Sequence, residues 1–288
     1  MSSPVFAPPA EVAAPVPQAR EFGLYSIAQV VDSNDSHAQG GVQYDPLGCA
    51  TVSAVSAACG TPGGPPMPAT VTLDASRWVR TVAFTVYTGP AGKLLAYTPE
   101  GLQDKARTWL TLGEEWAVER ALWTGAPFDA ATPGLHLATG VQSPQNPNGV
   151  EVLAPAPVPG KLALGLLEEA LGNRLLGRGV LHVPAVVEPF LPGLSPQGAR
   201  MQTEVHTDVV VGRGYTGSGP DGTARAADSA WVYGTGSVKV TRGELFDVGG
   251  PDAGRLLNRT TNDITVLAGR LVTVTYECAL VGVRVALS

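Results

Sequence analysis

The sequence predicts an α+β fold in which strands outnumber helices. Residues 99–124 carry the start, periodicity and stop signals of one long helix, whereas 71–97 and 251–288 are rich in β-branched and aromatic residues. The 35 glycines and 25 prolines make up about a fifth of the 288 residues. This content indicates many turns and extended segments rather than a helical bundle.

The first 70 residues are expected to form an N-terminal arm. Residues 1–20, MSSPVFAPPAEVAAPVPQAR, are rich in proline and alanine and lack the regions of a secretory signal. In residues 21–70 the apolar stretch FGLYSIAQVV is expected to be extended, and turn-forming runs follow it. An apolar but fragmented segment needs a surface to lie on, and we expect a neighbouring subunit to provide it.

Residues 71–97 predict a β-hairpin with Lys93 near its tip, because TGPAG separates VTLDASRWVRTVAFTVY from KLLAY. The helix then begins with Thr98 as the N-cap and Pro99 at the first helical position, and Gly125 ends it. Its 26 residues would span about 39 Å. The residues at helical spacing on one face are Leu102, Ala106, Trp109, Leu110, Gly113, Ala117 and Ala121.

The second half of the chain predicts one more helix and several strands. The helix covers KLALGLLEEALGNRLLG and ends before Gly179. Strands are predicted in VLHVPAVV, TEVHTDVVVG and SAWVYGTGSVKVTRG, and the stretch DITVLAGRLVTVTYECALVGVRVALS is almost wholly β. The apolar stripe of the helix consists of Leu164, Leu167, Leu171 and Leu175.

The composition limits the classes of partner. Charged residues make up 15%, against about 25% in typical domains. Either further copies of the chain cover this uncharged surface, or the chain is a compact monomer rich in Ala, Gly and Val. The net charge of −6 and the absence of a basic patch argue against tight nucleic-acid binding. No stretch approaches the ~18–20 apolar residues of a membrane span.

Three cysteines are present, and none is part of a C-x-x-C motif. This pattern argues for reduced thiols and against a structural zinc site. A bond between Cys49 and Cys59 stays open. Cys278 is expected to lie inside a strand as a small buried apolar residue.

Residues 212–217, GRGYTG, match the dinucleotide-binding pattern G-x-G-x-x-G after the apolar run Val209–Val211. That motif works because its last glycine opens a helix whose N-terminus binds the pyrophosphate. Here SGPDG follows Gly217, and its glycines and proline oppose a helix. We therefore expect a glycine-rich loop between two strands that binds no nucleotide.

Other catalytic patterns are missing as well. The four histidines, His37, His136, His182 and His206, have no metal-ligand spacing, and there is no G-x-S-x-G motif. The carboxylates Glu114, Glu115 and Glu119 are interpreted as a solvated or intersubunit face of the long helix. The sequence thus predicts a non-enzyme without catalytic, cofactor-binding or metal-binding residues and without a cofactor.

Three tryptophans of the long helix are spaced by seven residues: Trp109, Trp116 and Trp123. Each is rotated about the helix axis by only about 20° from the one before, so all three lie near one face. A row of anchors on a neighbouring subunit is one interpretation, since tryptophan is favoured at interfaces. A core stripe is the favoured one.

The order of these elements resembles that of the major capsid proteins of tailed bacteriophages, which have the Hong Kong 97 fold. The resemblance covers residues 20–288 and includes the helix end EEWAVERALWTG, the strands GVLHVP and AWVYGTGSVKVTR, and the β-rich finish. It implies five regions: an N-terminal arm (1–70), an extended β-hairpin loop (71–98), a peripheral domain with the long spine helix (99–160), an axial domain (161–250) and closing strands of the peripheral domain (251–288).

The same resemblance implies a structural protein that assembles into the pentamers and hexamers of an icosahedral head around double-stranded DNA. The implied partners are further copies, portal, scaffold and decoration proteins, and packaged DNA without sequence-specific contacts; no membrane is implied. The location would be the virion, after assembly in the bacterial host cytoplasm. The alternatives are the shell of an encapsulin-type compartment and a phage decoration or tail protein.

Some members of this fold join a lysine of the extended loop to an asparagine of a neighbour, with help from a glutamate. Lys93 would be the lysine, and Asn258 or Asn262 the acceptor. Only four lysines are present. We therefore expect no isopeptide cross-links.

Overall fold

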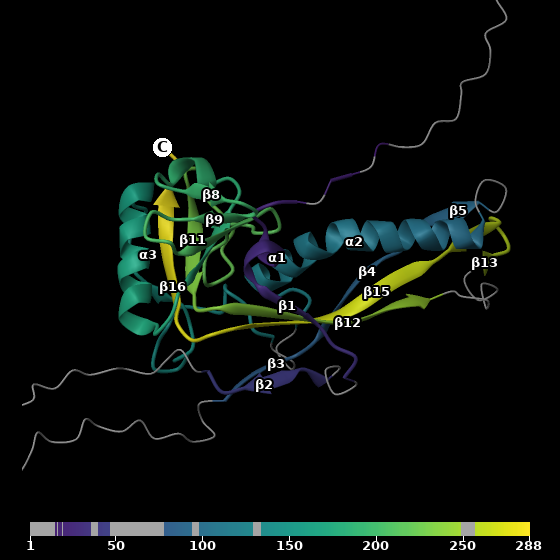
Figure 1. Cartoon of the computed structure of the whole chain (residues 1–288), viewed down its shortest axis with the longest axis horizontal. Helices are drawn as coiled ribbons and strands as arrows, with labels where there is room; N and C mark the ends of the chain where they lie inside the picture. Colours follow the sequence, from purple (N-terminus) through teal and green to yellow (C-terminus); the bar gives the residue numbers. More distant parts are fainter. Residues whose placement is uncertain are drawn as a thin grey trace, which may run out of the picture.

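The chain has a globular part and an elongated part, and one long helix runs from the tip of the elongated part to their junction (Figure 1). The computed structural model describes residues 15, 17, 18, 20–35, 40–46, 78–93, 98–128, 134–248 and 257–288. Strands predominate over helices in these ranges, as the sequence predicts. None of the helices in the described ranges is long and apolar enough to cross a membrane.

The long helix α2 (Pro99–Thr124) has the bounds that the sequence predicts. The Thr98 hydroxyl accepts a hydrogen bond from the Gly101 N–H at 3.1 Å, and Pro99 occupies the first turn. Gly125 ends the helix with a φ of 76°, a left-handed conformation that costs glycine little. The expected apolar face is confirmed at Leu102, Ala106, Leu110 and Ala121.

The elongated part pairs α2 with a four-stranded sheet in the order β1-β12-β15-β4. Its strands are β1 (Gln29–Asp32), β12 (Val238–Val248), β15 (Leu267–Tyr276) and β4 (Phe84–Thr88). The antiparallel β12–β15 ladder runs from Val238 opposite Tyr276 to Val248 opposite Leu267. One face of the sheet packs on α2 and forms the larger hydrophobic core. Its members on β15 are Ala268, Val272, Val274 and Tyr276.

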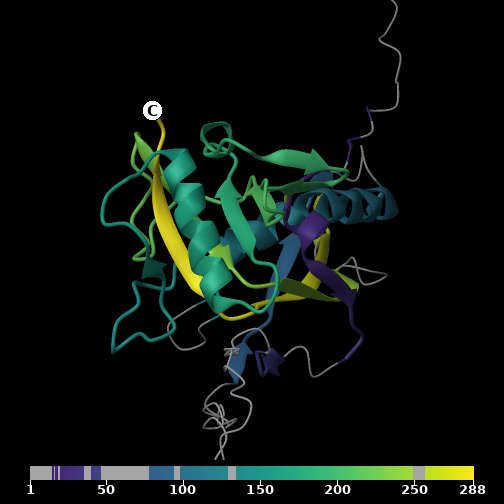
Figure 2. The same cartoon turned by 60° about the vertical axis from the view of Figure 1, so that its left-hand side comes forward.

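The globular part contains a seven-stranded sheet in the order β6-β16-β11-β7-β10-β9-β8. In chain order its strands are β6 (Glu151–Val152), β7 (Val180–Pro184), β8 (Ser195–Gln197), β9 (Arg200–Gln202), β10 (Asp208–Gly212), β11 (Ser229–Thr235) and β16 (Leu280–Ala286). Helix α3 (Gly160–Arg174) lies across one face of this sheet (Figure 2). A short 3-10 turn, η3 (Glu188–Phe190), follows β7. The second core lies between α3 and the sheet, through Ala163, Leu167 and Leu171.

The expected hairpin at 71–97 is wrong, because its strands pair with other segments. β4 pairs with β15, whereas β5 (Ala91–Lys93) joins a separate sheet with β14 (Asp263–Thr265) and β13 (Leu257–Asn258). Lys93 therefore lies opposite Asp263 in a strand and not at a hairpin tip. Instead β3 (Val79–Thr81) pairs antiparallel with β2 (Val42–Tyr44).

Part of the expected arm belongs to the fold of its own subunit. Leu24–Ile27 form one helical turn, α1, rather than an extended segment, and Leu24 is completely buried. The carbonyl oxygen of Phe22 accepts a hydrogen bond from the Val211 N–H at 2.8 Å, and β1 pairs with β12. Apolar side chains of the N-terminal segment thus fill the chain's own core.

The remaining strands of the second half are confirmed, but sheet membership does not follow the expected domain borders. β12, from the expected axial region, lies in the elongated sheet, and β16, from the expected closing strands, lies in the globular sheet. Helix α3 ends at Arg174, and the expected stripe is buried at Leu167 and Leu171 but only half-buried at its two ends.

Candidate assembly surfaces and the buried carboxylates of the long helix

The glycine motif of residues 212–217 packs on α2. The Gly214 N–H donates a hydrogen bond to Glu119 Oε2 at 2.8 Å. A Cβ at this position would meet the Trp116 carbonyl oxygen and lie 2.8 Å from Glu119 Cβ. The chain then reaches β11 without a helix, so the expected loop between two strands is confirmed. The Gly214 amide, already bonded to a carboxylate, is not available to a phosphate.

The interpretation of the three glutamates as a solvated or intersubunit face is wrong. Glu119 is 2% exposed and Glu114 is 3% exposed. Glu119 Oε1 accepts a hydrogen bond from the Leu24 N–H at 3.1 Å. Glu115 accepts one from the Tyr25 N–H at 2.7 Å. We call Glu114, Glu115 and Glu119 the carboxylate cluster; it holds the N-terminal segment on α2.

Glu114 connects the same helix to the elongated sheet. It accepts a hydrogen bond from the Tyr25 hydroxyl at 2.8 Å and forms ion pairs with Arg270 at 3.1 Å and Arg242 at 3.5 Å. Arg242 in turn pairs with Asp32 at the end of β1 at 2.8 Å. A buried carboxylate needs such partners because an unpaired buried charge is costly. The cluster therefore joins segments that are 89 to 156 residues apart.

Burial dominates the electrostatics of the cluster. It raises the pKa of Glu119 to about 7, although the Gly214 and Leu24 amides oppose the shift. Burial also raises the pKa of Glu115 and that of the Tyr25 hydroxyl. Glu119 thus titrates near neutral pH. Its two oxygens are also the hydrogen-bond acceptors of the Leu24 and Gly214 amides.

His182 is a structural residue of the core. His182 on β7 lies 2.8 Å from the Tyr215 hydroxyl and 2.9 Å from the Thr235 hydroxyl, and burial lowers its pKa to about 3. It is therefore a neutral core residue with both ring nitrogens satisfied. His37 lies outside the described residues. Among the residues that the structure describes, no group of His, Cys, Asp and Glu could hold a metal ion.

Cys278 differs from its expected state in two ways. It lies in the turn between β15 and β16, half-buried, and not inside a strand. It is also disulfide-bonded, so the expectation of reduced thiols is wrong for this residue. The only other cysteines, Cys49 and Cys59, lie outside the described residues.

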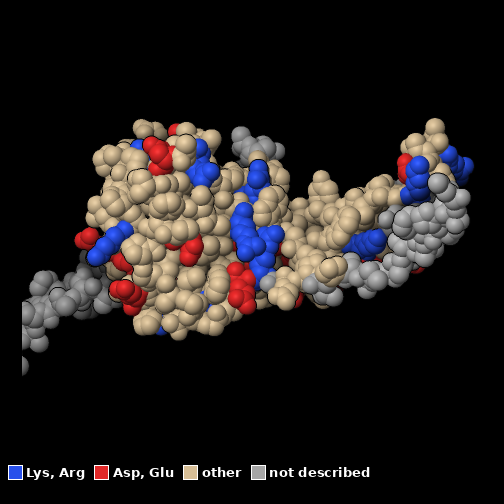
Figure 3. Space-filling view, turned by 90° about the horizontal axis from the view of Figure 1, so that it is seen from above, with Lys and Arg blue, Asp and Glu red and all other residues tan. Residues whose placement is uncertain are grey.

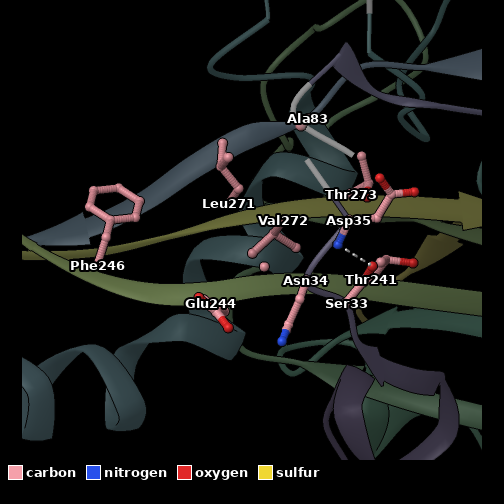
Figure 4. Close-up of a pocket in the computed structure, with 11 residues that line it drawn as sticks. Ser33, Asn34, Asp35, Ala83, Thr241, Glu244, Phe246, Leu271, Val272 and Thr273 are labelled. Carbon is pink, nitrogen blue, oxygen red and sulfur yellow. Dashed lines mark hydrogen bonds between the residues drawn. The ribbon is translucent and has the colours of Figure 1, made fainter. Parts of the chain in front are cut away.

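A shallow groove of about 280 Å³ lies on the sheet face opposite α2 (Figure 4). Phe246 closes one end, and Asn34 and Asp35 lie at the other. Its middle is lined by strand residues, among them Thr241, Leu271 and Thr273.

Several large apolar side chains remain exposed on the elongated part. Trp109 is 52% exposed and Trp116 is 40% exposed, whereas Trp123 is fully buried beside Tyr215 and Tyr233. The core-stripe interpretation is thus right for Trp123 and wrong for the other two. On the opposite sheet face the exposed members are Tyr87, Phe246 and Val248. Exposed aromatic clusters of this kind mark interaction surfaces.

Uncharged residues cover most of the molecular face in Figure 3. Lysine, arginine and acidic side chains form one mixed band near the junction of the two parts, and smaller charged groups lie on the globular part and at the tip of the elongated part. Interface cores are depleted in charge. This surface is therefore suited to contact with other protein.

The sequence matches no family model and no curated protein sequence. The structure is similar to chains of three capsids. The capsid of the native GTA particle matches with a TM-score of 0.56 and 13% identity over 98% of this chain and 96% of the other. The capsid of the empty GTA particle matches with a TM-score of 0.56 and 11% identity over 97% of this chain and 95% of the other. The capsid of Ralstonia phage GP4 matches with a TM-score of 0.51 and 11% identity over 99% of this chain and 98% of the other. The Hong Kong 97-like α+β fold expected from the sequence is confirmed.

Proposed function

We propose that this chain is the major capsid protein of a tailed bacteriophage. Copies assemble into pentamers and hexamers that form an icosahedral head around double-stranded DNA. The observation that carries the proposal is the structural match, which covers nearly the whole of this chain and nearly the whole of each capsid chain.

The surface supports the same role. Trp109 and Trp116 project from the outer side of α2, and Tyr87 and Phe246 lie on the sheet face opposite the helix. The elongated part therefore exposes aromatic residues on both sides. A single subunit leaves this apolar surface in water, and contact with further copies would bury it at ~25 cal/mol per Å². Closed rings of heterologous contacts use two different faces of each copy.

The fold also supports a revised division of the chain. We assign the elongated part to the peripheral domain and the globular part to the axial domain. Portal, scaffold and decoration proteins and packaged DNA remain proposed partners, and the virion, assembled in the host cytoplasm, remains the proposed location. The role is structural, without a catalytic step.

Expression of the chain alone, followed by electron microscopy, tests the proposal. We expect closed shells or rings of five and six copies. Small oligomers that bind only to preformed heads would favour a decoration protein. Closed shells that load a host enzyme and no DNA during infection would favour the encapsulin alternative.

A surface variant tests the role of the exposed tryptophans. The double substitution Trp109→Glu and Trp116→Glu is expected to leave the subunit folded and to abolish shells, because charge is unfavourable in an interface core. Thr108→Glu, which adds a charge to an exposed position of the same helix, is the matched control. Normal shells from the double variant would show that this helix face stays in solvent.

A further inference from the structure

We propose that the exposed face of α2 in one copy docks on the exposed face of α3 in a second copy, so that two tryptophans of α2 lie over two glycines of α3. The choice of a second copy as the partner rests on the proposed function. The fit between the two helix faces does not, because it follows from their residues, spacing and exposure. Such a contact uses two different faces of each subunit, as a closed ring requires.

The outward face of α3 is not the polar surface that an amphipathic helix usually presents. The buried side of the helix packs on the seven-stranded sheet (Figure 2). The opposite side carries four exposed residues at intervals of three and four positions: Leu162, Gly165, Glu169 and Gly172. We call these four residues the α3 crest. Leu162 is 52% exposed, and Glu169 is the single charged member of the crest.

The fold of the single subunit does not explain the two glycines of the α3 crest. A Cβ at Gly165 or Gly172 would meet no atom of another described segment within 4 Å. Neither residue has the positive φ that favours glycine. In a helix interior, glycine is less favourable than any other residue except proline. The subunit therefore loses helix stability at two exposed positions, and a gap that admits a large side chain of another copy gives a reason for both.

The exposed face of α2 supplies large side chains at the matching spacing. It carries a series that we call the α2 ridge: Trp109, Gly113 and Trp116. The ridge advances by four and then three residues, and the α3 crest makes the same two steps from Gly165 to Gly172. Seven residues advance a helix by about 10.5 Å. Two parallel helices can therefore seat both tryptophans over both glycines at once, as knobs enter holes.

The middle positions of the ridge and the crest also fit each other. In the parallel alignment Gly113 lies opposite Glu169, and a Cβ at Gly113 likewise has open space around it. Within the described part of the chain, Glu169 has no hydrogen-bond or ion-pair partner, and neither do the indole N–H groups of Trp109 and Trp116. A buried indole N–H usually finds an acceptor. The Glu169 carboxylate, which lies between the two glycines, can accept from an indole N–H of the docked ridge.

Filling the two gaps tests the contact in the full-length chain. The double substitution Gly165→Leu and Gly172→Leu causes no clash at Cβ within the subunit. Because leucine favours a helix, we expect the Tm of the unassembled subunit to rise by roughly 2–5 °C. Electron microscopy and sedimentation velocity should nevertheless show the loss of most assembled particles, because the gaps that the tryptophans need are filled. Gly40→Leu, at an equally open glycine beside β2, is the matched control and should assemble normally.

An exchange of large and small residues tests the alignment. Trp109→Ala alone should reduce assembly. Adding Gly165→Trp should restore most of it, because the large side chain has moved to the opposite face of the same contact. Adding Gly172→Trp instead should not restore it, because Trp116 then meets another tryptophan. Restoration by neither added substitution, or by Gly172→Trp, would overturn the proposed contact.

The outcomes separate this contact from the proposed function. Normal assembly of the double leucine variant would overturn the contact, while the chain would remain a shell protein. A lower Tm of that variant would show that the glycines serve the fold of their own subunit, and would overturn the contact as well. A wild-type chain that stays a single subunit at every concentration would overturn both the contact and the proposed function.

Discussion

Glu119→Gln is expected to remove a large part of the pH dependence of subunit stability. Glu119 lies in the most enclosed part of α2, where its two oxygens accept hydrogen bonds from the Leu24 and Gly214 amides. Glutamine has nearly the same shape and keeps one carbonyl oxygen, but it does not ionise. The substitution therefore removes the ionisation, and with it one of the two acceptors, so the change of stability with pH rather than its absolute value reports the buried charge.

The size and sign follow from the pKa. Burial raises the pKa of Glu119 from 4.5 in the unfolded chain to about 7 in the folded one. The folded state thus holds the proton more tightly, and the contribution of Glu119 to stability is greatest below pH 4.5. It is lost as the pH rises to about 7, and no further loss occurs above that. At ~1.36 kcal/mol per pKa unit, the loss is about 3 kcal/mol.

Urea unfolding of the unassembled subunit at pH 5 and pH 8 measures this quantity. In the wild-type chain we expect the contribution of Glu119 to the free energy of unfolding to be about 2–3 kcal/mol smaller at pH 8 than at pH 5. Glu119→Gln should lack this difference. Glu115→Gln is the matched control. The pKa of Glu115 is also raised by burial, so this variant should remove its own contribution while the Glu119 contribution remains.

The same pH dependence in wild type and Glu119→Gln would refute the reasoning. Such a result would mean that water reaches the carboxylate, so that burial does not control its pKa. A steeper pH dependence in the variant would also contradict it. Unfolding followed separately by tryptophan fluorescence and circular dichroism checks that the transition is two-state.

Three further results are expected. Gly214→Ala should lower the free energy of unfolding by more than about 2 kcal/mol in urea unfolding, since a Cβ would meet the Trp116 carbonyl oxygen, and a thermal-shift screen of the wild type should show no nucleotide binding. Deletion of residues 1–20 should leave a folded subunit by circular dichroism, whereas deletion of residues 1–32 should unfold it, because Leu24 and β1 belong to its core. Assembled particles boiled in detergent and reductant should give one band near 29.7 kDa on a denaturing gel, and a ladder of multimers that disappears in Lys93→Ala would contradict the expected absence of isopeptide bonds.

Local signals predicted the parts of the fold that local interactions determine. The N-cap Thr98 and the stop at Gly125 gave the bounds of α2 because both act within one turn of the helix end. The longer strands of the second half were found from their β-branched residues, whereas the short strands β8 and β9 were missed. Their pairing was not predictable: β4 and β5 are adjacent in sequence, yet β4 pairs with β15 and β5 with β14. Which strands pair depends on long-range packing.

The carboxylate cluster was misread because helical periodicity fails where a helix is enclosed on more than one side. The first half of α2 contacts the elongated sheet on one face only, and its apolar spacing shows this. In the second half, the N-terminal segment and the Gly214 loop also pack on the helix. Residues at almost every position there are consequently buried: Val118, Glu119, Ala121, Leu122 and Trp123. Trp116, between these segments, stays exposed.

This enclosure explains why acidic residues lie inside the protein. The two segments that reach α2 are not strands at their points of contact, so their amides at Leu24 and Gly214 have no ladder partner. A buried amide without an acceptor costs about 1–3 kcal/mol. Glu119 supplies both acceptors from one side chain. Close approach then requires glycine beside the helix, because a Cβ at Gly23 would meet the Glu115 carboxylate, as one at Gly214 would meet the helix backbone. A glycine beside a helical glutamate is thus required at both contacts, and this requirement accounts for Gly214, the central glycine of the nucleotide-like motif at 212–217.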